Sequence, residues 1–396
     1  MRKPLFFVVF ISFGFWNMCS STTTSLWAQE DITTAFQREK TEDDPPQWQT
    51  FKEDLNTWRQ MITEVYDSFY AFQLSELEAD RNRLRKQWSE SKKEAALAFE
   101  TARASAIELY KAAPNRYKEV EQLLFVIVRD EVAQGRHERA VEVLYPFTDH
   151  LINLNGEEEA FYQQAFKSAQ IINDYESVRK YYKYTFAPDR RDKVVSPLPI
   201  SDAEKSWNLE TEVRKKEEST NLPRVELETT KGKIIIELFE NEAPNTVANF
   251  ITLVEKGFYD GLTFHRVLRN ENGFAIAQGG DPNGNGTGGP GYFIPCECYQ
   301  ANARLHFRGS ISMAHGGKNT GGSQFFFALN RIQNLDRKHT VFGRIVEGID
   351  IAAQLQLIDP EKKEDAIIPD EILSAKVLRK RDHQYNVNKV DKDQQH

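Results

Sequence analysis

Hydrophobic positions along this chain follow two different periods, and the first extends over residues 48–186. Apolar residues recur there at steps of three and four positions, which is the spacing of amphipathic helices. The clearest run is Phe51, Leu55, Trp58, Ile62, Val65, Phe69 and Phe72. Pro114 and Gly135 mark two expected helix ends. The pattern predicts an all-α domain made of helical hairpins, with its many aromatic side chains in the core.

Two segments of this domain resemble the turn of a tetratricopeptide-type helical hairpin. In residues 132–141, Gly135 stands between two helical stretches, and Ala140 leaves room for close packing. In residues 171–178, Asn173 occupies the corresponding place, about 38 residues later, which is near the repeat length of such arrays. Ordinary helical hairpins would give the same weak signal, so both interpretations stay open.

The second period begins at about residue 224. Residues 225–229 alternate apolar and charged side chains, as a half-buried strand does, and residues 233–240 form a second such run. Lys231 and Gly232 between them are typical of a tight turn. The two runs therefore predict a β-hairpin.

The remaining pattern indicates a β-barrel with flanking helices. Residues 244–256 return to helical spacing with Pro244 in the first turn, where proline is tolerated. Short apolar runs separated by Gly-rich loops then continue to about residue 378. Residues 187–222, with three prolines and many charges, predict a linker carrying one short helix at about 203–216.

The N-terminus is typical of an export signal. Arg2 and Lys3 precede an apolar stretch at residues 5–15, and Ala28 stands just before Gln29 at a plausible cleavage point. The stretch is shorter than the roughly 20 apolar residues of a membrane-spanning helix, although a membrane anchor is the alternative. A lipoprotein site at Cys19 is a second alternative, disfavoured because small residues do not precede it. We therefore predict a signal peptide at 1–28, followed by a flexible polar segment at 29–47.

Charge and cysteine content narrow the function further. The net charge of −8 argues against nucleic acid as a partner, because phosphate contacts need clustered Lys and Arg. After signal removal only Cys296 and Cys298 remain, which is too few for a disulfide framework. The pair could form a small strained ring or two free thiols, and a metal site would need further ligands, of which only His306 is near. We expect a structural or incidental role for both cysteines.

Four short segments of the second half form a specific pattern through their order and spacing. They are FHRV at 264–267, QGGD at 278–281, SMA at 312–314 with GSQFF at 322–326, and LDRKHTVFG at 335–343, with NGTGG at 285–289 between them. In this pattern the chain resembles the cyclophilin family of peptidyl-prolyl cis-trans isomerases. The resemblance covers roughly residues 224–381 and implies a closed β-barrel isomerase domain at 223–381, followed by a disordered tail at 382–396.

The chemistry of proline isomerisation suits these residue types. Rotation of an X-Pro bond passes through a twisted amide in which the proline nitrogen regains its lone pair. A fixed donor placed there stabilises the transition state more than the planar ground state. Arginine stays charged and presents a rigid fork of donors. Because no bond breaks, the reaction needs no nucleophile, metal or cofactor.

The resemblance assigns roles to individual residues. It implies that Arg266 is the catalytic donor and that Gln278 holds the guanidinium and contacts the substrate backbone. The residues implied to bind substrate are Phe274, Gln278, Gly286, Ala314, His315, Gln324, Phe326, Leu335 and His339. Alternatives from the residues alone are a surface ion pair for Arg266, a core position for His339 and a merely flexible loop around Gly286. His265 and His306 are expected to be structural.

Three positions depart from the family pattern. The segment 268–277 is longer than usual, so Ile276 could face the pocket in place of Phe274. Asn334 stands where many members carry a pocket tryptophan, which implies weak cyclosporin binding. His315 replaces a commoner asparagine, a change of little consequence if that position acts through its backbone.

The sequence thus predicts an exported isomerase that assists folding of proline-containing polypeptides, with no nucleic-acid partner and no membrane contact after signal removal. The alternative is a proline-peptide-binding scaffold or chaperone with little turnover, whose helical domain recruits partners. Residues 393–396 are not an endoplasmic-reticulum retention tetrapeptide, which favours a periplasmic or secreted location.

Overall fold

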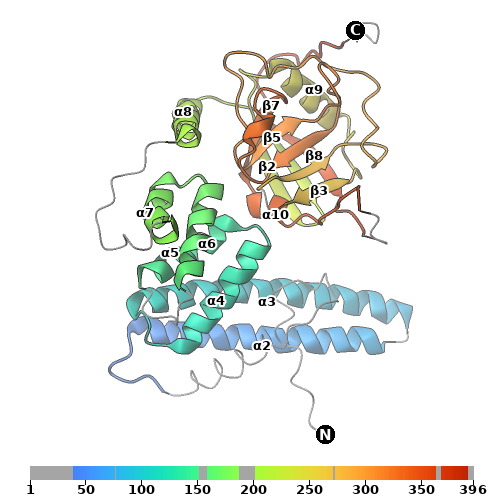
Figure 1. Cartoon of the computed structure of the whole chain (residues 1–396). Helices are drawn as coiled ribbons and strands as arrows, with labels where there is room; N and C mark the ends of the chain where they lie inside the picture. Colours follow the sequence, from blue (N-terminus) through green and yellow to red (C-terminus); the bar gives the residue numbers. More distant parts are fainter. Residues whose placement is uncertain are drawn as a thin grey trace. The chain divides into compact units, whose positions relative to one another are not determined.

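The computed structural model describes residues 39–75, 77–150, 158–186, 201–270, 273–362 and 367–390. The predicted signal peptide, the first part of the predicted flexible segment and residues 187–200 of the predicted linker lie outside these ranges. The chain divides into two compact units, one formed by residues 1–133 and 138–165 and the other by residues 134–137 and 166–396. Figure 1 shows the long helices of the first unit and the sheet of the second.

The prediction of an N-terminal all-α region is confirmed. Its helices are α2 (Pro46–Leu74), α3 (Glu78–Ala112), α4 (Lys118–Ala133), α5 (His137–Asp149), α6 (Glu158–Ile171) and α7 (Tyr175–Phe186). Among the described residues, no helix has the length and apolar character needed to cross a membrane.

Helices α2 and α3 pair as an antiparallel hairpin. The Trp58 ring lies 5.2 Å from Phe99, and the Phe72 ring stacks on Trp88 at 5.8 Å. The contacts run in opposite order along the two helices, and Figure 1 shows the two helices side by side. The apolar face of α2 that the sequence indicated is buried in this pairing.

The two turns singled out in the sequence share a backbone conformation. Gly135 has φ +72° and Asn173 has φ +62°, both in the left-handed region that glycine and asparagine adopt most readily. The turns are therefore alike locally. Whether they belong to a tetratricopeptide array remains a prediction.

The second unit contains an eight-stranded antiparallel sheet with helices, as predicted. Its strand order is β3-β4-β6-β5-β7-β2-β1-β8. The strands are β1 (Arg224–Thr229), β2 (Gly232–Leu238), β3 (Arg266–Arg269), β4 (Ala275–Gly279), β5 (Ser310–Met313), β6 (Phe325–Ala328), β7 (Val341–Glu347) and β8 (Ile372–Arg379). The flanking helices include α9 (Pro244–Glu255), α10 (Ile349–Ala353) and the short 3₁₀ helix η3 (Gln333–Leu335).

The predicted barrel is not closed by a continuous ladder of hydrogen bonds between its two end strands. Strands β3 and β8 are the two ends of the strand order, and they are joined through the residues beside them. The Gly261 amide donates to the Ile372 carbonyl at 2.7 Å, and the Phe264 amide donates to the Asp370 carbonyl at 2.9 Å. In the described residues the sheet is thus a curved barrel-like sheet closed by a short stretch of bonds.

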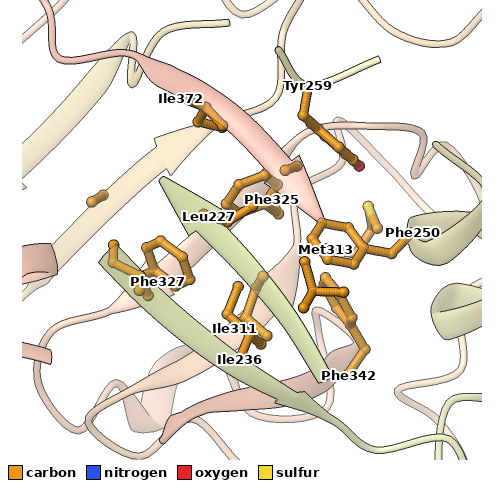
Figure 2. Packing of buried hydrophobic residues seen from close by; sticks show 14 of the residues in the cluster. Leu227, Ile236, Phe250, Tyr259, Ile311, Met313, Phe325, Phe327, Phe342 and Ile372 are labelled. Carbon is orange, nitrogen blue, oxygen red and sulfur yellow. The ribbon is translucent and has the colours of Figure 1, made fainter. Parts of the chain in front are cut away.

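The core lies on the concave side of this sheet and is rich in phenylalanine. Phe250 of α9 packs edge-on against Phe325 at 5.7 Å and also contacts Phe342 at 5.3 Å (Figure 2). Strand β6 is buried on both faces because Phe325 and Phe327 enter this core while Phe326 enters a second apolar cluster. This alternation directs Phe326 away from the core.

A further helix, α8 (Asp202–Glu217), occupies the end of the predicted linker. The Ser201 hydroxyl caps it by accepting the Glu204 amide at 3.1 Å. The predicted short helix is present, but it packs on the barrel and does not merely connect two domains. The Trp207 ring lies edge-on to Phe307 with centroids 4.9 Å apart. The boundary drawn at residue 222 therefore cuts through a packed structure.

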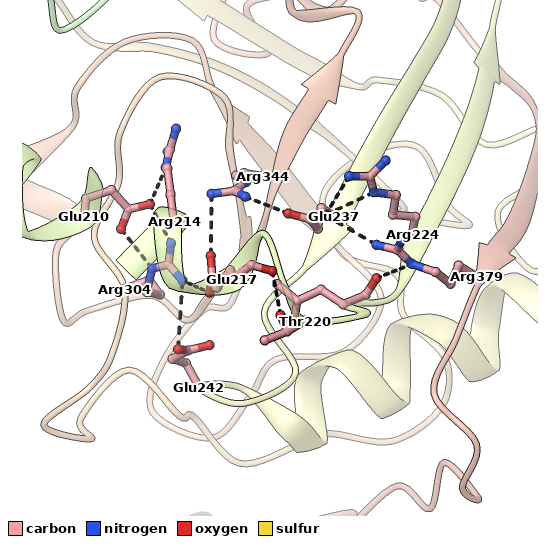
Figure 3. Close-up of polar contacts among 11 residues, drawn as sticks. Glu210, Arg214, Glu217, Thr220, Arg224, Glu237, Glu242, Arg304, Arg344 and Arg379 are labelled. Atoms are coloured by element: carbon pink, nitrogen blue, oxygen red, sulfur yellow. Dashed lines mark hydrogen bonds and ion pairs between the residues drawn. The ribbon is translucent and has the colours of Figure 1, made fainter. Parts of the chain in front are cut away.

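Arg304 holds α8 against the barrel (Figure 3). Its guanidinium donates to Glu210 at 2.6 Å and 2.8 Å and to Glu217 at 2.5 Å, and it stacks over the Phe239 ring at 3.8 Å. The Arg304 side chain is 4% exposed. The charges are buried but paired, which is the condition for tolerating them in the interior.

Part of the segment 382–396, which was predicted to be a disordered tail, makes specific contacts with the barrel. The Asn388 amide donates to Asn245 at the start of α9 at 2.6 Å, and Val390 forms a β-bridge with Phe293. Tyr385 packs against the core. Polar composition concealed these contacts, because they depend on partners far earlier in the chain, 143 positions away for Asn388.

Candidate active site

A row of four side chains crosses four neighbouring strands on the face of the sheet opposite the core. Arg266 of β3 pairs with Gln278 of β4, Gln278 with Phe326 of β6, and Phe326 with Ser312 of β5. Residues directly opposite in antiparallel strands project to the same face. The core takes their sequence neighbours Val267, Ala277, Phe325, Phe327, Ile311 and Met313.

A chain of hydrogen bonds fixes the polar end of this row. The Arg266 guanidinium donates to Gln278 Oε1 at 3.5 Å, and Gln278 Nε2 donates to Gln324 Oε1 at 3.0 Å. Gln324 Nε2 in turn donates to the carbonyls of Gly286 at 3.0 Å and Gly288 at 2.9 Å. Because each amide is held at both ends, the oxygen of Gln278 points toward the guanidinium.

The Arg266 guanidinium keeps most of its donors available. Its bond to Gln278 is at the long limit for a hydrogen bond. Within the ranges that the structure describes, no carboxylate forms an ion pair with it. The side chain is half-buried.

An apolar cluster of side chains adjoins this donor. Phe326 is 3% exposed and Ile276 is 2% exposed, and together with Ala328 and Ile332 they form a cluster separate from the main core. The half-buried members of the same cluster are Leu268, Phe274, Ala314 and Leu335. Three of the residues predicted to bind substrate, Phe274, Phe326 and Leu335, thus meet in one place.

Phe274 and Ile276, the two alternatives for the pocket position, both belong to this cluster. Ile276 lies on β4, paired with Leu268 on one side and Ala328 on the other, while Phe274 precedes the strand. The cluster also contains Leu268, Ala328 and Ile332, which the sequence analysis did not single out. Leu268 and Ala328 lie two positions along their strands from Arg266 and Phe326, and residues two apart on a strand share a face. This spacing could have identified both from the sequence.

His339 borders the pocket as a neutral ring. It meets Phe326 edge-on with centroids 5.6 Å apart, and its Nδ1 lies 3.1 Å from the Met313 carbonyl. Burial lowers the pKa of His339 to about 4, and the nearby His315 contributes to this. The His315 ring stacks on it at 4.2 Å.

His306 supports the pocket from behind. Its ring is parallel to that of Phe326 at 5.7 Å, with Nδ1 at 3.1 Å from Asp336 Oδ1 and Nε2 at 3.0 Å from Ser312 Oγ. Burial lowers the pKa of His306, and Asp336 offsets part of this effect. The ring is fully buried, in agreement with the structural role expected for it. His265 is also buried, and burial lowers its pKa.

The loop around Gly286 is ordered by one carboxylate. Asp281 accepts the amides of Asn283 at 2.8 Å and Asn285 at 3.0 Å, and it also accepts the Gly286 amide. Burial raises the pKa of Asp281, but these backbone donors lower it further, so the net pKa is below its usual value. Gly286 therefore lies in a fixed loop beside Gln324, which argues against the alternative of a merely flexible loop.

The last predicted positions lie at the groove edge. The Ala314 amide donates to the Gln324 carbonyl at 2.9 Å, and Ala314 packs on the pocket cluster. His315 is half-buried, and its Nε2 lies 2.8 Å from the Lys338 carbonyl. Asn334 is exposed in η3 next to Leu335.

A half-buried guanidinium and an apolar cluster thus lie beside one another on one face of a curved antiparallel sheet. The family model described as cyclophilin type peptidyl-prolyl cis-trans isomerase/CLD matches residues 224–377. The chain belongs to the cyclophilin family and is a peptidyl-prolyl cis-trans isomerase.

Bacterial relatives support this assignment. A peptidyl-prolyl cis-trans isomerase of Helicobacter pylori is 49% identical over 153 residues, which are 39% of this chain and 88% of the relative. One from Synechococcus elongatus is 58% identical over 118 residues, 30% of this chain and 77% of the relative. Peptidyl-prolyl cis-trans isomerase B of Bacillus subtilis is 50% identical over 132 residues, 33% of this chain and 89% of the relative.

Proposed function

We propose that Arg266 is the catalytic donor of this isomerase and that the protein acts after export. The observation that carries the catalytic part is the pairing of Arg266 with Gln278 directly beside the Phe326 pocket. In this proposal the apolar cluster around Phe326 receives the proline ring, and the Arg266 guanidinium then stands beside the ring nitrogen.

The proposed mechanism stabilises one geometry of the amide. In the planar X-Pro bond the nitrogen lone pair is delocalised, and the barrier to rotation is roughly 18–20 kcal/mol. At the twisted state the nitrogen becomes a hydrogen-bond acceptor, and Arg266 donates to it. This bond is absent from the planar ground state, so it lowers the barrier without tightening substrate binding equally.

The neighbouring residues position donor and substrate. Gln278 and Gln324 fix the guanidinium through their hydrogen-bond chain. His339 stays neutral at physiological pH because its pKa is about 4, so it adds no second cation beside the proline ring. Gly286 and Ala314 leave backbone room for the residues that precede the proline.

Substitution of Arg266 tests this role. We expect Arg266→Ala to lower kcat/KM for a proline test peptide by about 10²–10³-fold, the cost of losing one preorganised donor. Arg266→Lys should recover part of the activity, because it keeps the charge but not the fork. Arg224→Ala, on the distant strand β1, is the matched arginine control.

A second readout separates catalysis from binding. Because the pocket remains in Arg266→Ala, the affinity for a proline peptide should change by less than about threefold while turnover is lost. Full turnover in Arg266→Ala would refute the assignment. Wild-type protein no faster than buffer would instead favour a binding scaffold.

Export is supported by the charged start and short apolar stretch at residues 1–28. Expression in a bacterium with a periplasm should yield mature protein that begins at Gln29. N-terminal sequencing of the periplasmic fraction measures this, and protein that keeps residues 1–28 and stays in the cytoplasm would contradict it.

The helical region supports a second, partner-binding role. Leu74 and Leu77, at the junction of α2 and α3, are 79% and 68% exposed. We infer that this apolar tip contacts polypeptide clients. A full-length Leu74→Ser/Leu77→Ser variant should keep its activity on a short peptide and lose chaperone activity toward an unfolded protein; equal chaperone activity would argue against this role.

A further inference from the structure

The C-terminal segment, residues 381–390, makes specific contacts that the isomerase mechanism does not use. It lies beyond residues 224–377, which match the family model. The Tyr385 hydroxyl donates to Glu240 at 3.1 Å, and Val387 packs against the barrel core. The segment therefore follows a defined course along the barrel.

The end of this segment holds the chain around Tyr292. The Val390 amide donates to the Phe293 carbonyl at 2.9 Å, and the two residues form a β-bridge. The Lys389 ammonium lies over the Tyr292 ring, 4.1 Å from its centroid, where the ring face attracts a cation. Tyr292 itself is half-buried and packs against the barrel core. The C-terminal segment and the core thus both contact this ring.

The Tyr292 hydroxyl is linked to the active-site strand through Asn249 of α9. The hydroxyl donates to Asn249 Oδ1 at 2.8 Å, and Asn249 Nδ2 donates to the Gly322 carbonyl at 2.8 Å. The Asn249 side chain is fully buried. A buried amide that is bonded at both ends holds its two partners at a fixed separation, because breaking either bond leaves a polar group unsatisfied. Tyr292 is therefore tied to Gly322, two positions before Gln324.

The stretch of chain that ends at Tyr292 also meets Gln324 directly. Two carbonyls of residues 286–292 accept the Gln324 side-chain amide, at 3.0 Å and 2.9 Å. Pro290 of the same stretch lies so close to Gly322 that an added Cβ there would be 2.9 Å from Pro290 Cδ. Residues 286–292 therefore contact both the Gln324 side chain and the backbone that precedes it.

We propose that Tyr292 is a positioning residue for the isomerase reaction, and that the C-terminal segment holds it in place through Lys389 and Val390. Tyr292 acts through Gln324, which begins the hydrogen-bond chain that ends at the Arg266 guanidinium. This inference rests on the proposed function, in which the placement of that guanidinium sets the rate. A small displacement of a catalytic group lowers turnover strongly and leaves the apolar cluster that receives the proline ring unchanged.

Tyr292→Phe tests the hydroxyl alone, since it removes the bond to Asn249 and keeps the ring. We expect kcat for a proline test peptide to fall about fivefold, the scale of one hydrogen bond's net contribution, while KM changes by less than about twofold. Tyr299→Phe removes a hydroxyl from a ring that is 55% exposed, and this matched control should leave kcat unchanged. A wild-type kcat in Tyr292→Phe would overturn the proposal.

A double-mutant cycle distinguishes positioning from a general loss of stability. Arg266→Ala has no guanidinium to align, so adding Tyr292→Phe should lower its residual kcat by less than about twofold. Each variant is assayed at a temperature at which circular dichroism shows it fully folded. An equal loss from Tyr292→Phe in the two backgrounds would mean that Tyr292 does not act through Arg266.

NMR spectra of the full-length protein give a readout that does not depend on Arg266. The side-chain amide resonances of Gln324 should shift or broaden in Tyr292→Phe and stay unchanged in Tyr299→Phe. Unchanged Gln324 resonances in Tyr292→Phe would count against the proposal. If Arg266→Ala keeps full turnover, the proposed catalytic role fails, and this spectrum alone decides whether Tyr292 positions Gln324.

The role of the C-terminal segment is tested at its two contacts. Lys389→Met removes the cation over Tyr292 and should lower kcat about threefold, whereas Lys389→Arg should keep the wild-type rate because arginine also binds the ring face. Val390→Pro removes the amide that donates to the Phe293 carbonyl, and the combined Lys389→Met/Val390→Pro variant should match Tyr292→Phe. Lys380→Met, which breaks a half-exposed ion pair with Glu255, is the matched lysine control and should be neutral. A combined variant with the wild-type kcat would show that the segment does not hold Tyr292.

Discussion

Replacement of Arg304 by methionine measures how firmly α8 is held on the barrel. The Arg304 guanidinium bonds to Glu210 at 2.6 Å and to Glu217 at 2.5 Å, and these three side chains are 4%, 7% and 5% exposed. Methionine keeps an unbranched side chain over the Phe239 ring but removes the charge. The substitution therefore leaves two buried carboxylates without their shared partner.

The expected cost follows from what each carboxylate retains. Removing one member of a buried ion pair costs about 3–5 kcal/mol. Glu210 still has Arg214 at 2.8 Å, and Glu217 still has Arg344 at 3.5 Å. The loss should therefore lie near the lower end, at about 3 kcal/mol, which is about a hundredfold in the opening equilibrium of α8.

Hydrogen–deuterium exchange of the full-length protein reports this local opening. We expect the α8 amides to exchange about a hundredfold faster in Arg304→Met. Lys215→Met on the same helix is the control, since Lys215 pairs with Glu212 at 3.0 Å in an exposed position and such pairs contribute little. Exchange in Arg304→Met that matches the control would refute the reasoning.

Lowering the pH provides a second test of the ion pair between Glu210 and Arg304. Burial raises the pKa of Glu210, but the bonds from Arg304 and Arg214 lower it further, so its net pKa in the folded protein is below the usual value. Its contribution to stability is therefore present above the unfolded-state pKa, about 4.3, and is lost as the pH falls through the folded-state pKa. The difference between wild type and Arg304→Met should shrink over that range.

The Glu297 carboxylate accepts two backbone amides at the start of α9, at 3.0 Å and 2.8 Å. Glu297→Ala should therefore lower the free energy of unfolding, measured in urea, by about 2 kcal/mol. An unchanged urea midpoint would contradict this. The His339 ring should titrate at about 4 in NMR spectra, and stability should fall between about pH 6.5 and 4, since the unfolded chain takes up that proton first. A ring pKa near 6.5 would be inconsistent with its burial. Gly280→Ala should lose about 3 kcal/mol or more, because φ is +81° and the new Cβ would lie 2.4 Å from the Ser323 carbonyl. Gly316→Ala, with open space around it, should be neutral in the same thermal unfolding assay.

The barrel and most of its site could be predicted because they are encoded locally. The alternation in residues 225–229 and the turn after them became β1 and β2. Arg266, Gln278 and Phe326 lie in short segments whose order is specific, and the sheet register brings them together. The segment before Gln278 is longer than in the family pattern, so the sequence did not decide whether Phe274 or Ile276 takes the pocket position. The sheet register was needed to place Ile276, which pairs with Leu268 and Ala328.

The flanks of the barrel could not be predicted in the same way. Glu210 and Arg304 are 94 positions apart, and Asn245 and Asn388 are 143 apart. Their segments are polar and have no clear period, so composition indicated a linker and a disordered tail. What orders them is specific long-range pairing, which a local pattern does not contain.

The row of side chains across β3, β4, β6 and β5 also sets the order in which the chain can become active. Gln278 and Gln324, which hold the Arg266 end of the row, are 46 positions apart, so they meet only when β4 has closed on β6. Strand pairing across such a separation is slower than the formation of a local hairpin. A refolding chain should therefore regain isomerase activity late. The return of activity then reports completion of the sheet and not the chain collapse that precedes it.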